Sequence, residues 1–131
     1  VRIVPKGLWS HPTELGFCDG GTSASAIAEH ADFTIPVDSI DNLGIEATFI
    51  KMDVEGAELS ALQGASKTNR TLSPRLAICI YHSGDQFLQV PQYLRSICPG
   101  YDFALRQHEY FSTELVFYAW PREYQPKGSP S

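Results

Sequence analysis

The stretch Ala47-Thr48-Phe49-Ile50-Lys51-Met52-Asp53-Val54 decides the fold of this chain. It is mostly apolar and rich in β-prone residues, a pattern typical of a strand that is covered on both faces in a parallel sheet. Directly after it, residues 55–63 place apolar side chains at helical spacing, with Glu55 and Glu58 where the helix dipole favours anions and Gly64 as a stop. A buried strand followed by a helix predicts an α/β domain.

The segments on either side predict further strands and helices. Strands are expected over residues 1–4, 14–18, 33–37, 75–81, 101–106 and 114–120, with Pro36 confining its strand to a sheet edge. A short helical turn is expected over 39–43 and a helix over 85–98, which Pro91 should kink or shorten. The last two strands are joined by too few residues for a helical crossover, so they should form an antiparallel hairpin.

The predicted architecture is therefore a Rossmann-like α/β sheet, mainly parallel, that ends in an antiparallel edge hairpin. Residues 1–120 are expected to belong to one domain. Asp19-Gly20-Gly21 should form a flexible turn, because glycine accepts positive φ, and the small residues that follow it leave their structure open. Residues 121–131 hold three prolines and little apolar content, so we expect them to form a loose tail.

Composition excludes some classes of function. With 131 residues and a net charge of -5, the chain would repel a phosphate backbone, so nucleic acid is a poor partner. No apolar run approaches the ~20 residues that cross a bilayer. Cys18, Cys79 and Cys98 are odd in number and far apart, which suggests neither a disulfide framework nor a metal clip and favours a cytoplasmic setting. The glycosylation pattern at residues 69–71 is treated as chance.

Ligands of open parallel sheets collect at the carboxyl ends of the strands, so polar residues that follow apolar runs are the first candidates. Asp53 is one, and with Glu55 and Glu58 it concentrates carboxylates that can orient a cationic ligand or a metal. The alternative is that the glutamates only complement the helix N-terminus while Asp53 caps the turn.

His82 directly follows the apolar run that ends at Tyr81, so its imidazole should lie beside Asp53 at the same edge of the sheet. An imidazole ordinarily titrates near pH ~6.5, which suits proton transfer at neutral pH. We therefore predict that His82 is a general base. The alternative is a histidine that hydrogen-bonds a loop carbonyl and does no chemistry.

Two further groups are candidates for ligand contact. Arg106, His108 and Tyr110 surround the turn between the last two strands and offer a cation, an imidazole and a phenol to a hydroxylated substrate. The alternative for them is a solvated hairpin end. Trp9 either stacks on an adenine or closes a hydrophobic patch.

The segment Lys51-Met52-Asp53-Val54-Glu55-Gly56-Ala57-Glu58, with Leu62-Gln63-Gly64-Ala65 after it, resembles the FkbM-type methyltransferase family, whose members carry a K-[IM]-D-V-E-G-A-E stretch. Further similar segments follow in the same order: residues 37–41, 80–82, 105–108 and 113–119. The resemblance covers Val1 to about Trp120.

The resemblance implies a class I methyltransferase fold, a seven-stranded sheet with one antiparallel strand, and methyl transfer from S-adenosylmethionine to oxygen, often a sugar or polyketide hydroxyl. Residues 1–4 would be the third strand, and the next two would end at Asp53 and His82, beside the sulfonium and the acceptor. Asp53 would orient the acceptor or the amino group of the cofactor. The cofactor's adenine would lie near Gly7, Leu8 and Trp9, and the acceptor near Tyr81, Arg106 and His108.

The chain departs from the family pattern in one respect: no glycine loop follows any strand, and no acidic residue ends a second strand to hold the ribose. These features are expected upstream of Val1, in a longer protein of which this chain is a fragment. One alternative is a non-catalytic interaction module whose first strand, residues 1–4, pairs with a partner chain. Another is a metal-dependent enzyme that uses Asp53, Glu55 and His82 with magnesium or manganese. Only a small hydroxylated acceptor is expected as partner, and a homo-oligomer is allowed for; no metal is assigned.

Overall fold

The computed structural model describes residues 1–18, 26–27, 30–110 and 114–123, whose strands form two four-stranded sheets. Sheet A has the order β1-β4-β2-β3, built from Gly7–Leu8 (β1), Thr13–Cys18 (β2), Ala26–Ile27 (β3) and Phe33–Asp38 (β4). Sheet B has the order β5-β6-β8-β7, built from Phe49–Met52 (β5), Arg75–Cys79 (β6), Tyr101–Gln107 (β7) and Leu115–Pro121 (β8). The helices are Ile40–Leu43 (α1), Glu58–Gln63 (α2), Ser66–Thr71 (α3) and Gly84–Ile97 (α4).

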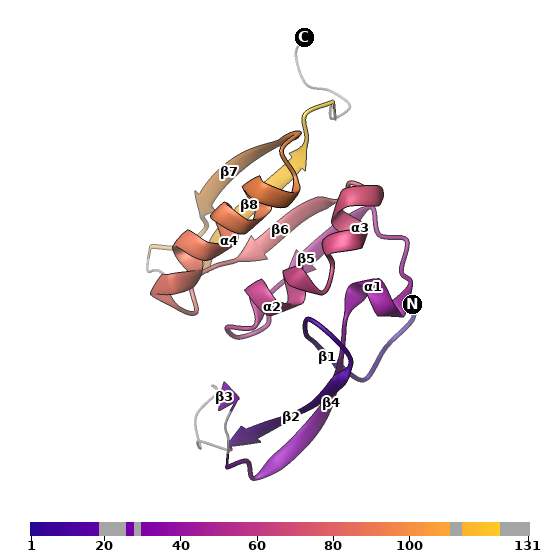
Figure 1. Ribbon diagram of the computed structural model, residues 1–131. Helices are drawn as coiled ribbons and strands as arrows, with labels where there is room; N and C mark the ends of the chain where they lie inside the picture. Colours follow the sequence, from indigo (N-terminus) through magenta and orange to yellow (C-terminus); the bar gives the residue numbers. More distant parts are fainter. Residues whose placement is uncertain (19–25, 28–29, 111–113, 124–131) are drawn as a thin grey trace.

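Helices α2, α3 and α4 cover one face of sheet B, while β2 and β4 extend away from it as a two-stranded arm (Figure 1). The main core lies between that face and the helices, because side chains alternate between the faces of a strand. Met52 and Ile78 point into this core and pack with Leu62, Val90 and others. Ala77 and Cys79, on either side of Ile78 in β6, point to the helix-free face, where they form a second, smaller cluster with Val116.

The predicted mainly parallel sheet is wrong. Among the strand pairs of the described residues, β1–β4 and β5–β6 are parallel, and the other four pairs are antiparallel. The reason is that hydrophobic periodicity identifies a strand but does not give its direction. The excursion through β2 returns to β4 as an antiparallel ribbon, and β8 joins β6 antiparallel. The predicted hairpin of the last two strands, β7 and β8, is confirmed.

Two expectations near the start of the chain are also wrong. Residues 1–4 form no strand; the first strand is β1, which pairs parallel with Val37 and Asp38. The interaction-module alternative concerned pairing of residues 1–4 with a partner chain, and it stays a prediction. Strand β4 is not at an edge either, since β1 and β2 flank it. Pro36 is tolerated there because β1 pairs only with Val37 and Asp38, so Pro36 has a strand partner on the β2 side alone.

The remaining elements follow the sequence pattern with shifted ends. The helical turn (α1), strands β5 and β6 and helix α4 are confirmed, and α4 continues past Pro91 to Ile97. Helix α2 begins at Glu58 rather than Glu55, because Glu55 and Gly56 have φ angles of 52° and 100°, which a right-handed helix excludes. Helix α3 was not predicted, since its polar sequence carries no apolar stripe.

Some expectations concern single side chains or lie elsewhere in the chain. Asn69 is 1% exposed, so its side chain is not accessible for glycosylation. The turn at residues 19–21 and the tail from residue 124 lie outside the described residues. No helix in the part of the chain that the structure describes is both long and apolar enough to cross a bilayer.

Asp38 ties the start of the chain to the α1 turn. Its buried carboxylate accepts hydrogen bonds from Lys6 Nζ at 2.7 Å, Ser39 N at 2.8 Å and Asn42 Nδ2 at 2.9 Å. The hydrogen bond from Lys6, followed by that from Asn42, lowers the pKa of Asp38 below its ordinary value. These contacts give the aspartate a structural role at a junction of three segments.

This lowered pKa predicts how stability depends on pH. A carboxyl group whose pKa is lower in the folded than in the unfolded chain stabilises the fold above its unfolded pKa, about 3.9, and loses that contribution as pH falls through its folded pKa. We expect Lys6→Met to destabilise the protein at pH 7 and to cost much less near pH 2. Urea unfolding of both proteins at the two pH values measures this. An equal cost at both would contradict the prediction.

Candidate functional site

Asp53 and His82 follow the two parallel strands of sheet B and meet at one rim. Strands β5 and β6 pair in parallel with Met52 opposite Ile78, so the residues that follow the two strands lie at the same end of the sheet. The structure brings His82 Nε2 to 3.4 Å from Asp53 Oδ1. The adjacency expected from the strand ends is therefore present.

Two glutamates complete the surroundings of the imidazole. His82 Nε2 lies 3.3 Å from Glu55 Oε2, and His82 Nδ1 lies 2.8 Å from Glu58 Oε1. The His82 side chain is 10% exposed and that of Glu58 is fully buried. Within the described residues, no group meets hydrogen-bond geometry with either ring nitrogen. The three carboxylates therefore lie close enough to the ring to interact with it electrostatically, but none of them forms a hydrogen bond of good geometry with it.

Glu58 organises the turn that carries Asp53 and Glu55. Its two carboxylate oxygens accept hydrogen bonds from Val54 N and Gly56 N, each at 3.0 Å. Gln86 Nε2, on α4, donates to the carbonyl of Gly56 and ties the same turn to the next helix. The left-handed backbone at Glu55 is thus held from within, a form of strain that occurs often at functional sites.

The sequence assigned Glu58 only as part of an acidic cluster or as a complement to the helix dipole. Its place at the first residue of α2 agrees with the dipole interpretation, but that interpretation missed the contact with His82. No local signal could have found this contact, because it depends on which strand lies beside β5, and that order cannot be read from the residues around Glu58.

Tyr81 connects the two strand ends. Its hydroxyl donates to Asp53 Oδ1 at 3.2 Å, and its ring lies 4.1 Å from the imidazole of His82, measured between centroids. Desolvation, and then the charge of Asp53, raises the pKa of Tyr81 to about 12. The phenol is therefore protonated at neutral pH and acts as a donor toward the carboxylate.

Asp53 and Tyr81 open onto a cavity of about 240 Å³ on the helix-free face of sheet B. Eight residues line it: Lys51, Asp53, Cys79, Tyr81, His108, Glu114, Val116 and Tyr118. The imidazole of His108 is held by the hydroxyl of Tyr118, 2.8 Å from its Nε2. Sequence reasoning missed Lys51, Glu114 and Tyr118; alternation along β5 and β8 was the signal that could have found the first and the last.

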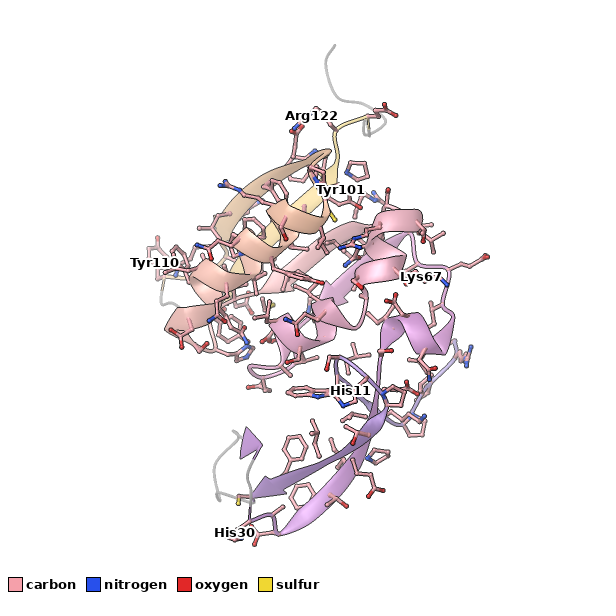
Figure 2. The ribbon with its side chains drawn as sticks, in the orientation of Figure 1. His11, His30, Lys67, Tyr101, Tyr110 and Arg122 are labelled. Atoms are coloured by element: carbon pink, nitrogen blue, oxygen red, sulfur yellow. The ribbon has the colours of Figure 1, made fainter. Side chains whose placement is uncertain are left out.

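The other expected contact residues lie outside this cavity. Arg106 is exposed on β7, opposite Val116, and Tyr110 extends into solvent at the end of sheet B opposite to Tyr101 and Arg122 (Figure 2).

The residues expected near an adenine lie around β1. Gly7 packs on Val37, and Leu8 lies against the main core. The backbone of Trp9 donates to the carbonyl of Asp38 and passes Gly64. The described contacts of these three residues are thus made with the protein backbone and with side chains of the core.

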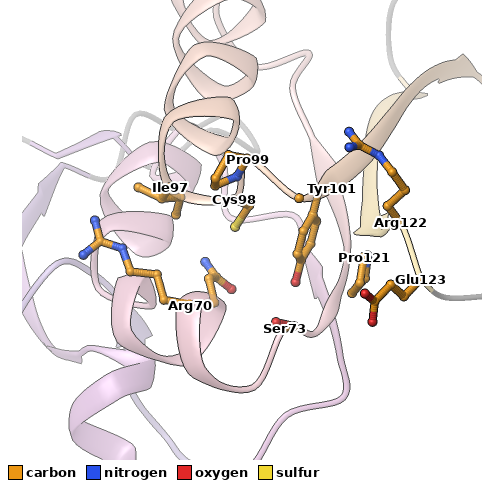
Figure 3. A pocket seen from close by; sticks show the side chains of 11 residues that line it. Arg70, Ser73, Ile97, Cys98, Pro99, Tyr101, Pro121, Arg122 and Glu123 are labelled. Atoms are coloured by element: carbon orange, nitrogen blue, oxygen red, sulfur yellow. The ribbon is translucent and has the colours of Figure 1, made fainter.

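A larger cavity, of about 490 Å³, lies at the opposite end of sheet B (Figure 3). Ser73, Cys98, Tyr101 and Pro121 line it together with Arg70 and others. The labelled guanidinium groups of Arg70 and Arg122 extend outward from it in Figure 3. None of the residues predicted to bind or react lines this cavity, so volume alone does not locate the chemistry.

Asp53, Glu55, Glu58 and His82 form a group that we call the rim cluster, and this cluster also has the composition of a cation site. One ligand atom from each of Asp53, Glu55 and His82 can be chosen so that all lie within 4.8 Å of one another. Carboxylate oxygen and imidazole nitrogen suit magnesium or manganese, with water filling the other positions. The two carboxylates are the exposed members, and His82 is partly buried.

Comparison with known proteins gives a consistent picture. A family profile described as the methyltransferase FkbM domain matches residues 9–107. A crystal structure described as methyltransferase FkbM from Methylobacillus flagellatus KT is similar, with a TM-score of 0.72 and 31% identity over 91% of this chain. The match covers 28% of that protein, so the chain spans less than a third of its length. A search of curated proteins gave no match. Asp53, Glu55, Glu58 and His82 all lie inside the matched range.

Proposed function

The chain belongs to the FkbM methyltransferase family, and we propose that it contributes reactive residues to an S-adenosylmethionine-dependent O-methyltransferase. The proposed acceptor is a hydroxyl of a sugar, polyketide or similar small molecule. One observation carries the proposal: the imidazole of His82, enclosed by carboxylates, lies at the carboxyl ends of two parallel strands, and Asp53 beside it lines a cavity. A hydroxyl group must lose its proton as it attacks, and this cluster offers a place for that proton.

His82 is proposed as the base. The negative charge of Glu58, 2.8 Å from Nδ1, favours a proton on that nitrogen. Nε2 is covered by Asp53 and Glu55, so the acceptor hydroxyl is proposed to reach it by displacing one of these exposed carboxylates. Once Nε2 has taken the acceptor proton, the ring is a cation. Asp53 and Glu55, both within 3.4 Å of Nε2, then stabilise it electrostatically.

Asp53 is proposed to orient the acceptor hydroxyl. Its side chain is 36% exposed, it lines the cavity, and it also lies against His82, so a hydroxyl that donates to it is brought close to Nε2. Tyr81 and His108 are proposed to contact the rest of the acceptor from the cavity wall. Arg106, exposed on the strand that leads to His108, would contact acceptors that extend beyond the cavity.

S-adenosylmethionine, when bound, would supply the methyl group from its cationic sulfonium, and the residues present fit such a group. Asp53 and Glu55 have exposed carboxylates that attract a cation, and Asp53 is proposed to contact the cofactor's amino group. Gly7, Leu8 and Trp9, at and after β1, are proposed to border its adenine.

Free thiols at all three cysteines support a reducing, cytoplasmic setting.

A methyl-transfer assay tests the function. The full-length protein is incubated with methyl-labelled S-adenosylmethionine and a panel of sugars and hydroxylated polyketides, and the labelled product is identified by mass spectrometry. We expect label on oxygen of at least one acceptor. Label that appears only on nitrogen or carbon of the product would contradict the proposal.

The spacing of Asp53, Glu55 and His82 favours a second candidate, metal-assisted methyl transfer. A divalent cation at this position would lower the pKa of a bound hydroxyl and replace His82 as the activating group. The same assay after treatment with a chelator distinguishes the two. Unchanged turnover supports the imidazole base, and turnover that is lost and then restored by magnesium or manganese supports the metal.

A further inference from the structure

We propose that Tyr81 is a positioning residue, whose hydroxyl and ring together hold the acceptor-orienting carboxylate of Asp53 and the imidazole of His82 in their reactive arrangement. This inference rests on the proposed function. It differs from the acceptor contact already proposed for Tyr81, because the effect is exerted through Asp53 and His82.

The hydroxyl contact fixes an otherwise mobile group. Tyr81 OH lies 3.2 Å from Oδ1 and 3.5 Å from Oδ2 of Asp53, while the carboxylate is 36% exposed and follows the last residue of β5. An exposed side chain at a strand end retains rotamer freedom unless a partner restricts it. The Tyr81 hydroxyl is such a partner, and it lines the cavity together with Asp53.

The direction of this contact follows from the two groups. A carboxylate oxygen accepts and a phenol O–H donates, so the Tyr81 hydroxyl is the donor toward Asp53. Its two distances, 3.2 Å to Oδ1 and 3.5 Å to Oδ2, place the hydroxyl against both oxygens of the carboxylate. The contact therefore restrains the orientation of the whole group.

The ring restrains the second reactive group. The Tyr81 ring lies 4.1 Å from the imidazole of His82, with an angle of 36° between the planes. Glu58 approaches the same imidazole at Nδ1. Tyr81 thus contacts both groups that the mechanism requires, one through its hydroxyl and the other through its ring, and Tyr81→Phe separates these contributions because it removes only the hydroxyl.

The experiment is a double-mutant cycle on the full-length protein with Tyr81→Phe, Asp53→Asn and the double variant. We expect Tyr81→Phe to lower kcat by about 10- to 100-fold, the scale of a reactive group displaced by up to an ångström, with the acceptor KM nearly unchanged. In the double variant Tyr81→Phe should add little to Asp53→Asn, because the hydroxyl acts through that carboxylate. Tyr93→Phe is the matched control: it removes a hydroxyl 3.5 Å from the Leu62 carbonyl, away from the rim, and should leave kcat unchanged.

Two results would overturn the inference. One is an effect of Tyr81→Phe confined to KM, and the other is full additivity with Asp53→Asn; each would make Tyr81 an acceptor contact alone. Imidazole NMR signals of His82 supply a readout that needs no turnover: Tyr81→Phe should shift them and Tyr93→Phe should not. An inactive wild-type protein that shows this shift would reject the proposed function and retain the positioning role, whereas unshifted signals would reject the latter.

Discussion

Replacing His82 with alanine lowers the turnover of the full-length protein by about 10²- to 10⁴-fold, the range expected when acid-base catalysis is lost. The reason is that His82 is the proposed base, with Asp53 and Glu55 near its Nε2 and Glu58 near its Nδ1. The affinity for S-adenosylmethionine should change little, because removal of the ring leaves the exposed carboxylates of Asp53 and Glu55 in place. Single-turnover kinetics and calorimetry with the cofactor measure the two effects.

His11→Ala is the control for this variant. His11 is exposed and contacts Ser10, so its loss removes an imidazole without touching the rim. Glu58→Gln provides a second test that leaves the His82 ring in place, because the amide keeps the shape of the carboxylate but removes the negative charge beside Nδ1. We expect an intermediate loss of turnover for it. If His82→Ala is folded and turns over at the wild-type rate, His82 has no part in the mechanism.

The largest loss of stability from a single added methyl group is expected at Gly64. A Cβ there would lie 2.2 Å from the carbonyl oxygen of Trp9 and 2.9 Å from Cβ of Ser39. The first neighbour is backbone, and Gly64 itself accepts a hydrogen bond from Asp41 N at 2.9 Å, so neither side can move without breaking contacts. Overpacking of this kind costs about 1–3 kcal/mol and occasionally more. We expect Gly64→Ala to lower the free energy of unfolding, measured in urea, by at least that amount.

Gly84→Ala is the matched control for Gly64→Ala. Gly84 is the first residue of α4, and a Cβ there meets no atom within 4 Å. Alanine favours a helix over glycine by up to about 1 kcal/mol, so this variant should be neutral or slightly stabilising. Equal unfolding free energies for the two variants would show that the close approach of Trp9 and Gly64 does not hold in solution. Gly64 φ is -71°, so any loss reports contact and not backbone strain.

The sequence predicted those parts of the fold that depend on local pattern. The apolar runs that became β5 and β6 and the spacing that became α4 are local, because a strand or helix must bury a face whatever its neighbours are. Strand direction and pairing depend on where the chain returns, and this is why the mainly parallel sheet was wrong. Residues 1–4 show the same limit: despite their β-prone side chains they pair with no strand among the described residues, and the pairing begins at Gly7.

The site was predictable to the extent that it follows from parallel strands. Asp53 and His82 each come after an apolar run, and β5 and β6 are the parallel pair of sheet B, so their adjacency could be expected. The enclosure of His82 by Glu58 depends on a turn with positive φ at Glu55 and Gly56, which shifts the start of α2. Nothing in the local pattern of residues 55–58 specifies that turn.

A crystal structure of the full-length protein with S-adenosylhomocysteine and its acceptor tests most directly whether chemistry takes place at this rim. We predict that the cofactor sulfur lies beside Asp53 and that the reacting hydroxyl contacts Nε2 of His82. A sulfur and acceptor bound at the opposite end of sheet B, near Tyr101 and Arg122, would contradict the proposed mechanism.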